Sequence, residues 1–181
     1  MDADAISIDY LKNHQNSITR LAQFSWQEWR PVYDRAQMTF DDVVRSYAQR
    51  ANTDVLPLAL VALHRGKIIG TGSLKLQDLD VRPQFTPWLG GLFVAPEYRG
   101  RGAGTALIQR LVEEALRLQI LCRYLWTPSA AALYTKLGWA SLETLGYCGY
   151  EITVMRRELR APISPPPGPA PNWDTSGDKR S

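Results

Sequence analysis

The residues whose types and spacing best suit chemistry form a glycine-rich stretch near the middle of the chain, Arg99-Gly100-Arg101-Gly102-Ala103-Gly104. An apolar run over 89–94 precedes it and predicts a buried strand, which Pro96 ends because proline lacks a backbone donor. Behind the glycines, apolar residues recur at three- and four-residue steps and predict an amphipathic helix. A strand, a glycine-rich loop and a helix N-terminus together make a site for phosphate.

The backbone supplies the chemistry of such a site. The first N–H groups of a helix have no partner within the helix, the helix dipole places positive charge there, and glycine lets a ligand approach closely. Arg99 and Arg101 add charge and paired donors for phosphate oxygens. We therefore predict that a pyrophosphate binds over residues 99–105. The predicted contacts are Arg99, Gly100, Arg101, Gly102, Ala103, Gly104 and Thr105.

Two common phosphate motifs do not fit this spacing. A P-loop needs a lysine after its last glycine, whereas Thr105 follows Gly104. A dinucleotide fingerprint would read Gly100-x-Gly102-x-x-Thr105, which lacks the final small residue and lies too far along a small chain. The plain alternative is that the glycines only make a tight connection between a strand and a helix.

Two segments instead resemble one known family. Val-x-Pro-Glu-Tyr followed by Arg-x-x-Gly-x-Gly, over 94–104, resembles the acetyl-coenzyme-A loop of the GNAT N-acetyltransferases. Residues 130–139, AAALYTKLGW, resemble that family's A-x-x-L-Y-x-K-x-G-F segment. Two motifs in the same order, about thirty residues apart, are more specific than either alone. The resemblance in order and length extends over about residues 5–160.

The resemblance implies an α/β (α+β) fold with a mixed, mainly antiparallel central sheet, two splayed parallel central strands and flanking helices. It also implies acetyl-coenzyme A as the co-substrate, bound between the strands at 89–94 and 123–127. Backbone N–H groups of Leu92, Phe93 and Val94 would hydrogen-bond the pantetheine arm and the thioester oxygen. We expect no metal, because the cysteines, Cys122 and Cys148, and the two histidines lack metal-ligand spacing.

Tyr134 is the residue that the resemblance implies as the proton donor to the departing sulfur, although a helical tyrosine can also serve only for packing. The base is open. An amine with a pKa of about 10.4 is mostly protonated at neutral pH and must lose a proton before it attacks. Many relatives carry a glutamate on the central strand, but 89–94 has no carboxylate. The candidates are Asp78, Asp80, Glu97 or water. Thr127 also departs from the asparagine that relatives often have there.

The remaining chain predicts the elements that position this site. Pro31 is expected to end the helix at 17–29, Thr39 to cap a helix with Asp42, and Gly138 to end the helix at 129–137 in a left-handed conformation. The predicted strands are a first one at Ile6, Ile8 and Tyr10, a hairpin of 58–63 and 67–75, and a closing antiparallel pair, 141–146 and 151–157. A loop over 77–87 precedes the central strand.

Composition bounds the organisation. The chain has 181 residues, 45% of them hydrophobic, and a net charge of +3 from scattered basic residues. We expect one acetyltransferase-like domain at 1–160 and a flexible proline-rich tail at 161–181. No leader segment is evident, and the apolar stretch around 55–63 is too short to cross a bilayer. These features predict a cytoplasmic protein without nucleic-acid or membrane partners and with reduced cysteines; a homodimer is compatible with them.

We therefore expect an N-acetyltransferase that moves acetyl from acetyl-coenzyme A to a primary amine of a small molecule or peptide, by direct attack in a ternary complex. The alternative is a non-catalytic acyl-coenzyme-A-binding regulatory protein, since the central strand lacks a carboxylate. The first two helices, the 77–87 loop and the closing hairpin are expected to bind the acceptor. Candidate pocket aromatics are Trp26, Trp29, Tyr33, Phe85, Trp88, Tyr147 and Tyr150, of which one or two are expected to line it.

Overall fold

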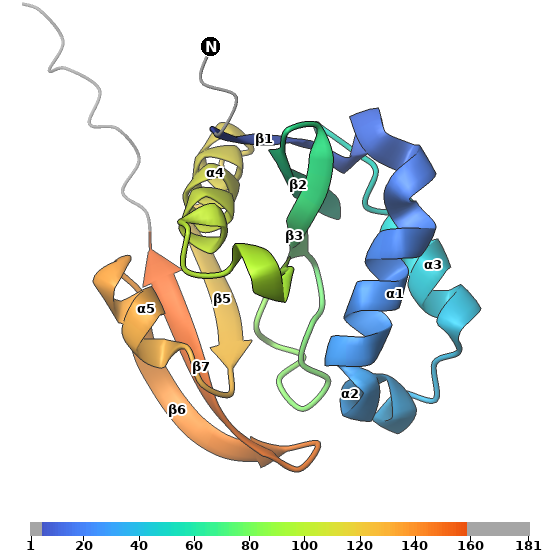
Figure 1. Cartoon of the computed structure of the whole chain (residues 1–181). Coiled ribbons are helices and arrows are strands. Elements are labelled where there is room, and N and C mark those ends of the chain that lie inside the picture. The colour runs from blue at the N-terminus through green and yellow to red at the C-terminus, as the bar shows by residue number, and fades with distance from the viewer. Residues whose placement is uncertain (1–4, 159–181) are drawn as a thin grey trace, which may run out of the picture.

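The computed structural model describes residues 5–158, so the predicted tail at 161–181 lies outside the described residues (Figure 1). The strands are β1 (Ile6–Tyr10), β2 (Leu58–His64), β3 (Lys67–Lys75), β4 (Trp88–Val94), β5 (Cys122–Thr127), β6 (Ala140–Tyr147) and β7 (Tyr150–Glu158). The helices are α1 (Ile18–Glu28), α2 (Arg30–Arg35), α3 (Phe40–Ala48), α4 (Ala103–Arg117) and α5 (Ala131–Lys136), with 3₁₀ turns η1 (Leu11–Ser17) and η2 (Pro96–Tyr98).

The strands form one seven-stranded sheet in the order β1-β2-β3-β4-β5-β7-β6. Only β4 and β5 run parallel, and every other neighbouring pair is antiparallel. A parallel pair needs a crossover, and α4 provides it. The predicted mixed, mainly antiparallel sheet with parallel central strands is confirmed.

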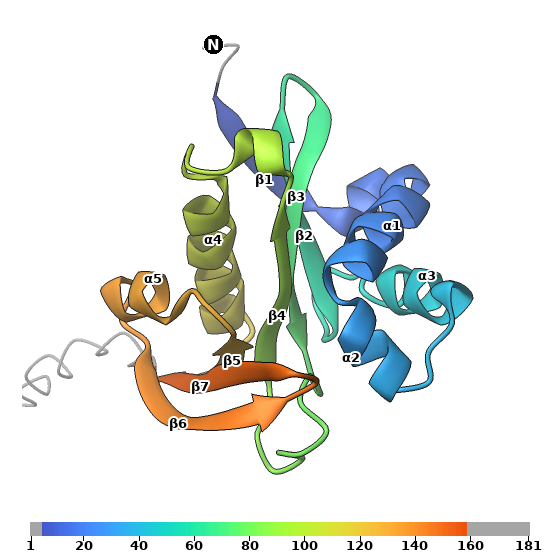
Figure 2. The ribbon, with the colours of Figure 1, turned by 60° about the horizontal axis from the view of Figure 1, so that its bottom comes forward.

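Helices cover both faces of the sheet. Figure 2 shows α4 and α5 on one side of the strands and α1, α2 and α3 on the other. On the first side, Leu107, Ile108 and Leu111 of α4 are fully buried against the sheet. Each such side chain contributes about 1.5–3 kcal/mol relative to exposure. On the second side, Leu21 and Val43 belong to a separate core that joins α1 and α3 to β2.

Small residues in β3 let α4 approach the sheet closely. A Cβ at Gly72 would lie 2.9 Å from Leu111 Cδ1 of α4, and one at Gly70 would lie 3.4 Å from Leu107 Cδ1 of α4 and 2.7 Å from the Phe93 carbonyl oxygen of β4. Thr71 and Ser73 alternate with these glycines and therefore face the helices α1 to α3. The N-terminus of α4 is thereby held beside the end of β4.

The structure differs from the sequence-based expectation at Pro31, and it buries a charged residue of α4, Glu114. Pro31 does not merely end α1: it lies in the first turn of α2, where its missing N–H removes no helical hydrogen bond. Glu114 of α4 is a carboxylate that is fully buried. Its oxygens lie 2.6 Å from Arg110 Nη1 and 2.8 Å from Arg117 Nε, which compensate the buried charge.

The predicted cap of α3 is confirmed and yields a stability prediction. Thr39 Oγ1 accepts from the Asp42 N–H at 3.2 Å, and Asp42 Oδ2 accepts from the Thr39 N–H at 2.8 Å. Thr39→Ala should lower the free energy of unfolding by about 1 kcal/mol at pH 7. Ser17 precedes α1 without a capping hydrogen bond, so Ser17→Ala is the matched control in urea denaturation. Equal effects of the two changes would contradict the cap.

Acid should weaken the same cap. Hydrogen bonds from Thr39 lower the pKa of Asp42 from 3.8 to about 2. A carboxylate with a lowered pKa in the folded state contributes stability above its unfolded pKa and loses it as pH falls through the folded value. The difference between wild type and Thr39→Ala should therefore narrow from pH 3.8 down to about 2, in the same denaturation assay.

Candidate active site

The parallel strands separate soon after they meet. Within the described residues, β4 and β5 pair only at Trp88 and Tyr124, and the Tyr124 N–H also donates to the Pro87 carbonyl at 3.0 Å. Beyond this point the sheet opens into a cavity of about 610 Å³ that is lined by residues 89–94 of β4 and by Trp126 of β5. The predicted splayed strands are therefore present, and a ligand can lie along the open edge of β4.

Most of the predicted cofactor contacts line this cavity. They are Leu92, Phe93, Val94, Arg99, Gly100, Gly102, Ala103, Gly104 and Thr105. Arg101 does not line it, and its guanidinium lies 5.8 Å from the ring centre of Tyr98. One cavity thus connects the glycine-rich loop to the central strand.

The loop has the geometry of an anion site. Gly100 and Gly102 adopt φ values of +73° and +86°, which other residues rarely adopt. Gly102 is the N-cap of α4, no side chain of residues 5–158 caps this helix, and its first turn has no acidic residue. The first N–H groups of α4 are therefore left without a side-chain partner, and the dipole of this 15-residue helix favours an anion there.

Arg99 links the loop to β4 and α1. Its Nε donates to the Val94 carbonyl at 2.9 Å, and its Nη2 lies 3.7 Å from Glu28 Oε2. The side chains of Arg99 and Glu28 are 51% and 43% exposed, so the ion pair is weak and the guanidinium can turn to a phosphate.

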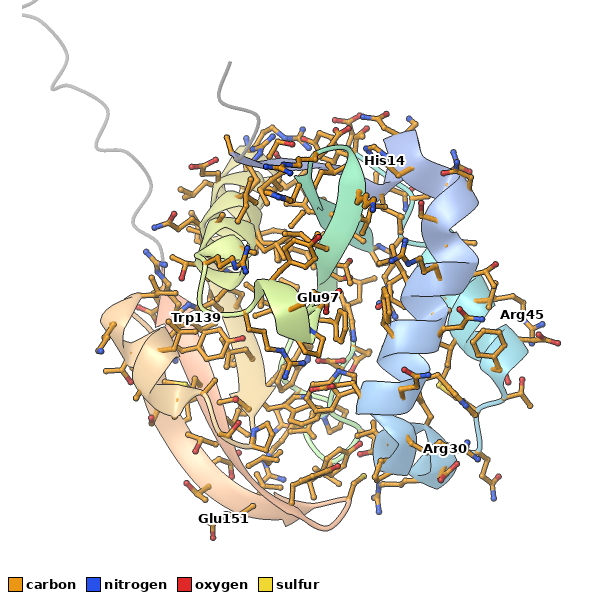
Figure 3. The ribbon with its side chains drawn as sticks, in the orientation of Figure 1. His14, Arg30, Arg45, Glu97, Trp139 and Glu151 are labelled. Atoms are coloured by element: carbon orange, nitrogen blue, oxygen red, sulfur yellow. The ribbon has the colours of Figure 1, made fainter. Side chains whose placement is uncertain are left out.

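Tyr134 lies in the far wall of the cavity. Thr127 Oγ1 accepts from the Ala130 N–H at 2.9 Å and so fixes the start of α5. Gly138, at φ +84°, ends the helix as predicted. After Gly138, the ring of Trp139 packs edge-on to the ring of Tyr134, with 6.1 Å between the ring centres (Figure 3). Burial raises the pKa of Tyr134 to about 12, so its hydroxyl keeps its proton at neutral pH.

Of the three carboxylates considered as the base, Asp78 alone lines this cavity. Its Oδ1 lies 2.5 Å from Lys75 Nζ, and both side chains are largely buried. Asp80 is more than half exposed and pairs with Arg35 at 3.3 Å. Glu97 is exposed on η2 and does not line the cavity (Figure 3).

A bulge in β4 brings Asp78 to the cavity. The register between β3 and β4 shifts between Thr71 and Ser73, and Gly91 has a φ of +61°. A Cβ at Gly90 would lie 2.2 Å from Asp78 Oδ2, and a Cβ at Gly91 would lie 3.5 Å from Arg50 Nη1. The two glycines therefore leave room for charged side chains against the strand. A glycine pair inside a strand was the available signal, and it was missed.

A second cavity, of about 460 Å³, lies between α2, the end of α3, β3 and the loop after β3. Among residues 5–158, Asp78 alone lines both cavities. Two of the predicted pocket aromatics line these cavities: Trp29 lines the first cavity and Tyr33 lines the second. Phe85, Trp88 and Tyr147 instead pack in a core cluster with β5 and β7.

The closing hairpin, β6 and β7, was also expected to contact the acceptor. No residue of β6 or β7 lines either cavity within the described part of the chain. Tyr147 of β6 packs edge-on to Trp126 at 5.7 Å and is buried. Trp126 also meets Trp29 edge-on at 5.2 Å, and both indole N–H groups are buried without a described acceptor. Two unpaired donors therefore border the first cavity.

Comparison with known proteins identifies the family. The model of the acetyltransferase (GNAT) family matches residues 17–139, which include the glycine-rich loop, β4, β5 and α5. The chain belongs to this family, as the resemblance of its two motifs predicted. A search of curated proteins found no significant match.

Solved structures share the fold at low identity. The PaiA N-acetyltransferase of Thermoplasma acidophilum, in complex with coenzyme A, is 19% identical, with a TM-score of 0.63 over 85% of this chain and 99% of that one. YncA of Salmonella typhimurium, with its cofactor acetyl-CoA, is 20% identical, with a TM-score of 0.65 over 91% and 99%. An aminoglycoside 6'-acetyltransferase type Ii is 19% identical, with a TM-score of 0.62 over 85% and 96%.

Two further features of residues 5–158 concern metals and membranes. These residues contain no group of three or more histidine, cysteine, aspartate or glutamate side chains placed to hold a metal ion. Within the same range, no helix combines the length and apolar character that a bilayer span requires. Cys122 and Cys148 are free thiols, each partly buried.

Proposed function

We propose that this protein transfers the acetyl group of acetyl-coenzyme A to a primary amine, by direct attack in a ternary complex. One observation carries the proposal: a single cavity connects an anion site at the start of α4 with the open edge of β4, with Tyr134 and with Asp78. Membership of the acetyltransferase family supports the acyl transfer. The two structural relatives that contain coenzyme A or acetyl-CoA support the co-substrate.

Different segments of this chain are proposed to bind different parts of the co-substrate. The amides of Gly102 to Thr105, with Arg99, suit the pyrophosphate because the helix start lacks any other cap. We propose that Arg101 adds attraction from outside the cavity. The open edge of β4 at Leu92 to Val94 offers backbone groups to the amides of the pantetheine arm, and the bulge at Gly91 lies where the edge meets Asp78.

Asp78 is the base in this proposal. Its carboxylate borders both cavities, so an amine that enters from the second cavity reaches the thioester beside it. The protonated amine first gives one proton to Asp78, which passes it to solvent. The neutral nitrogen then forms a bond to the carbonyl carbon and gives its second proton to Asp78 as the carbon–sulfur bond breaks. Sulfur then receives the proton of Tyr134, which solvent replaces. The products are an amide and the free thiol of coenzyme A.

Tyr134→Phe should lower kcat about 10²-fold, at the low end for general acid catalysis. The effect is limited because a phenol with a pKa of about 12 gives up its proton less readily than a thiol of pKa about 8.5. The same high pKa predicts that wild-type kcat does not fall between pH 7 and 10, because Tyr134 stays protonated. Tyr150→Phe, which changes a tyrosine outside both cavities, is the control for thiol release. A kcat unchanged by Tyr134→Phe would remove the acid role.

The proposed function is tested by thiol release from acetyl-coenzyme A with polyamines, aminoglycosides, amino acids and peptides as acceptors. Turnover with any primary amine, with the acetylamide confirmed by mass spectrometry, supports it. The second candidate is a non-catalytic acyl-coenzyme-A-binding regulator, favoured by the absence of a carboxylate on β4. Tight coenzyme A binding without turnover of any acceptor would decide for the regulator.

A further inference from the structure

The second cavity carries charge that the proposed reaction alone does not require. Arg50 and Lys75 both line it, beside Asp78. Lys75 is paired with Asp78, whereas Asp80 is turned to Arg35 at the exposed rim. The buried part of the cavity therefore contains two cations and one carboxylate.

Arg50 is the unbalanced cation. It is 6% exposed, and its Nη2 donates to Ser46 Oγ at 2.7 Å while its Nη1 lies 3.4 Å from Ser73 Oγ. Its guanidinium stacks on Tyr47 at 4.5 Å, and no carboxylate of the described residues forms an ion pair with it. Two hydroxyls satisfy only part of a guanidinium, which has five N–H donors. A buried charge without a counter-charge is costly, and a ligand anion would remove that cost.

Arg50 lies close to the proposed base, Asp78. Its Nη1 would lie 3.5 Å from a Cβ at Gly91, and the carboxylate of Asp78 lies against the neighbouring Gly90. An acceptor that reaches Asp78 from the second cavity therefore passes within contact range of Arg50. Burial and the charge of Arg50 lower the pKa of Lys75, which is the effect this positive environment would also have on a substrate amine. That effect favours the neutral, nucleophilic form.

We propose that the acceptor is a small molecule with a carboxylate a few bonds from its primary amine, such as a free amino acid, whose carboxylate binds Arg50 while its amine faces Asp78. A guanidinium binds a carboxylate through two parallel hydrogen bonds, which fixes the orientation of the amine. The cavity of about 460 Å³ lies within the range of small-ligand sites. This inference rests on the proposed acetyl transfer and adds the class of acceptor.

The first experiment compares matched acceptors with the wild-type protein. Each L-amino acid is tested beside its carboxamide and its decarboxylated amine, and peptides that begin with aspartate form a separate arm. The kcat/KM for at least one carboxylate-bearing acceptor should exceed that of its neutral counterparts by about 10²-fold. Comparing free amino acids with aspartyl peptides shows whether the carboxylate and the amine belong to a free amino acid or to the first residue of a peptide. Neutral counterparts that react equally well would overturn the inference.

The second experiment tests Arg50. Arg50→Met should lower kcat/KM about 10²-fold for the preferred acid and less than about 3-fold for its amide, and Arg50→Lys should recover part of the loss. Arg45→Met removes an exposed arginine of α3 and is the control (Figure 3). Equal losses for acid and amide would show that Arg50 only supports the fold.

Binding to the wild type provides a measurement that does not depend on a folded variant. The acid should raise the melting temperature of the protein saturated with coenzyme A, and its amide should not. Equal shifts would contradict the inference. If no amine of either set is acetylated although coenzyme A binds, the proposed function itself fails, which is a result distinct from loss of acid preference.

Discussion

Asp78→Asn should lower kcat about 10³-fold, within the range expected when a general base is removed. The substitution keeps the shape of the side chain but removes the group that accepts the amine proton beside the bulge of β4. It also leaves Lys75 without its paired carboxylate, so some loss of thermal stability is expected. The measurement is kcat at saturating acceptor, with coenzyme A affinity as the test that the variant is folded.

The pH profile separates a base from a structural residue. Without Asp78, only the fraction of acceptor that is already neutral can react, so activity of Asp78→Asn should rise with pH more steeply than that of the wild type. Asp41→Asn, an exposed change on α3, is the matched control. If Asp78→Asn retained activity within about 3-fold and kept the wild-type profile, solvent would be the base.

Gly90→Ala should have an effect of the same size, about 10³-fold in kcat, because it displaces the carboxylate of Asp78 without removing it. The new Cβ would lie 2.2 Å from Asp78 Oδ2, which no structure tolerates, and the short side chain must turn away. The carboxylate that has to move is also the partner of Lys75, so some loss of thermal stability is expected here as well. Gly146→Ala adds a methyl group to β6 in open space and is the control.

The double variant tests whether the two residues act together. If Gly90→Ala acts only through Asp78, adding Asp78→Asn should lower kcat little further. The loss of kcat in the double variant should then nearly equal the loss in either single variant. Fully multiplicative effects would contradict this link. They would indicate that the methyl group obstructs the co-substrate instead.

The phosphate loop could be predicted because its signal is local. Gly100, Gly102 and Arg99 lie within a few residues of one another, and the strand and helix on either side have their own hydrophobic periodicities. The caps at Thr39 and Gly138 are likewise encoded within one turn and are confirmed. The family resemblance added Tyr134, which the structure brings to the same cavity.

The base region could not be predicted in the same way, because it depends on contacts between distant residues. Asp78 and Asp80 lie two positions apart in one loop, and nothing local distinguishes the buried carboxylate from the exposed one. The difference arises from the β3–β4 register shift, which brings Gly90 against Asp78. Arg50 lies 23 residues before Ser73 in the sequence, and only the fold brings the two side chains together.

The most direct measurement of the central claim is calorimetric titration of the protein with coenzyme A. We expect one site per chain, and we expect reversal of both loop charges, Arg99→Glu with Arg101→Glu, to weaken binding by about 10²-fold, since charge-assisted hydrogen bonds to phosphate are lost. Arg30→Glu with Arg45→Glu changes the net charge equally on α2 and α3 and should leave the affinity nearly unchanged (Figure 3). Absence of heat with coenzyme A, or equal affinity for wild type and the loop variant, would contradict the account.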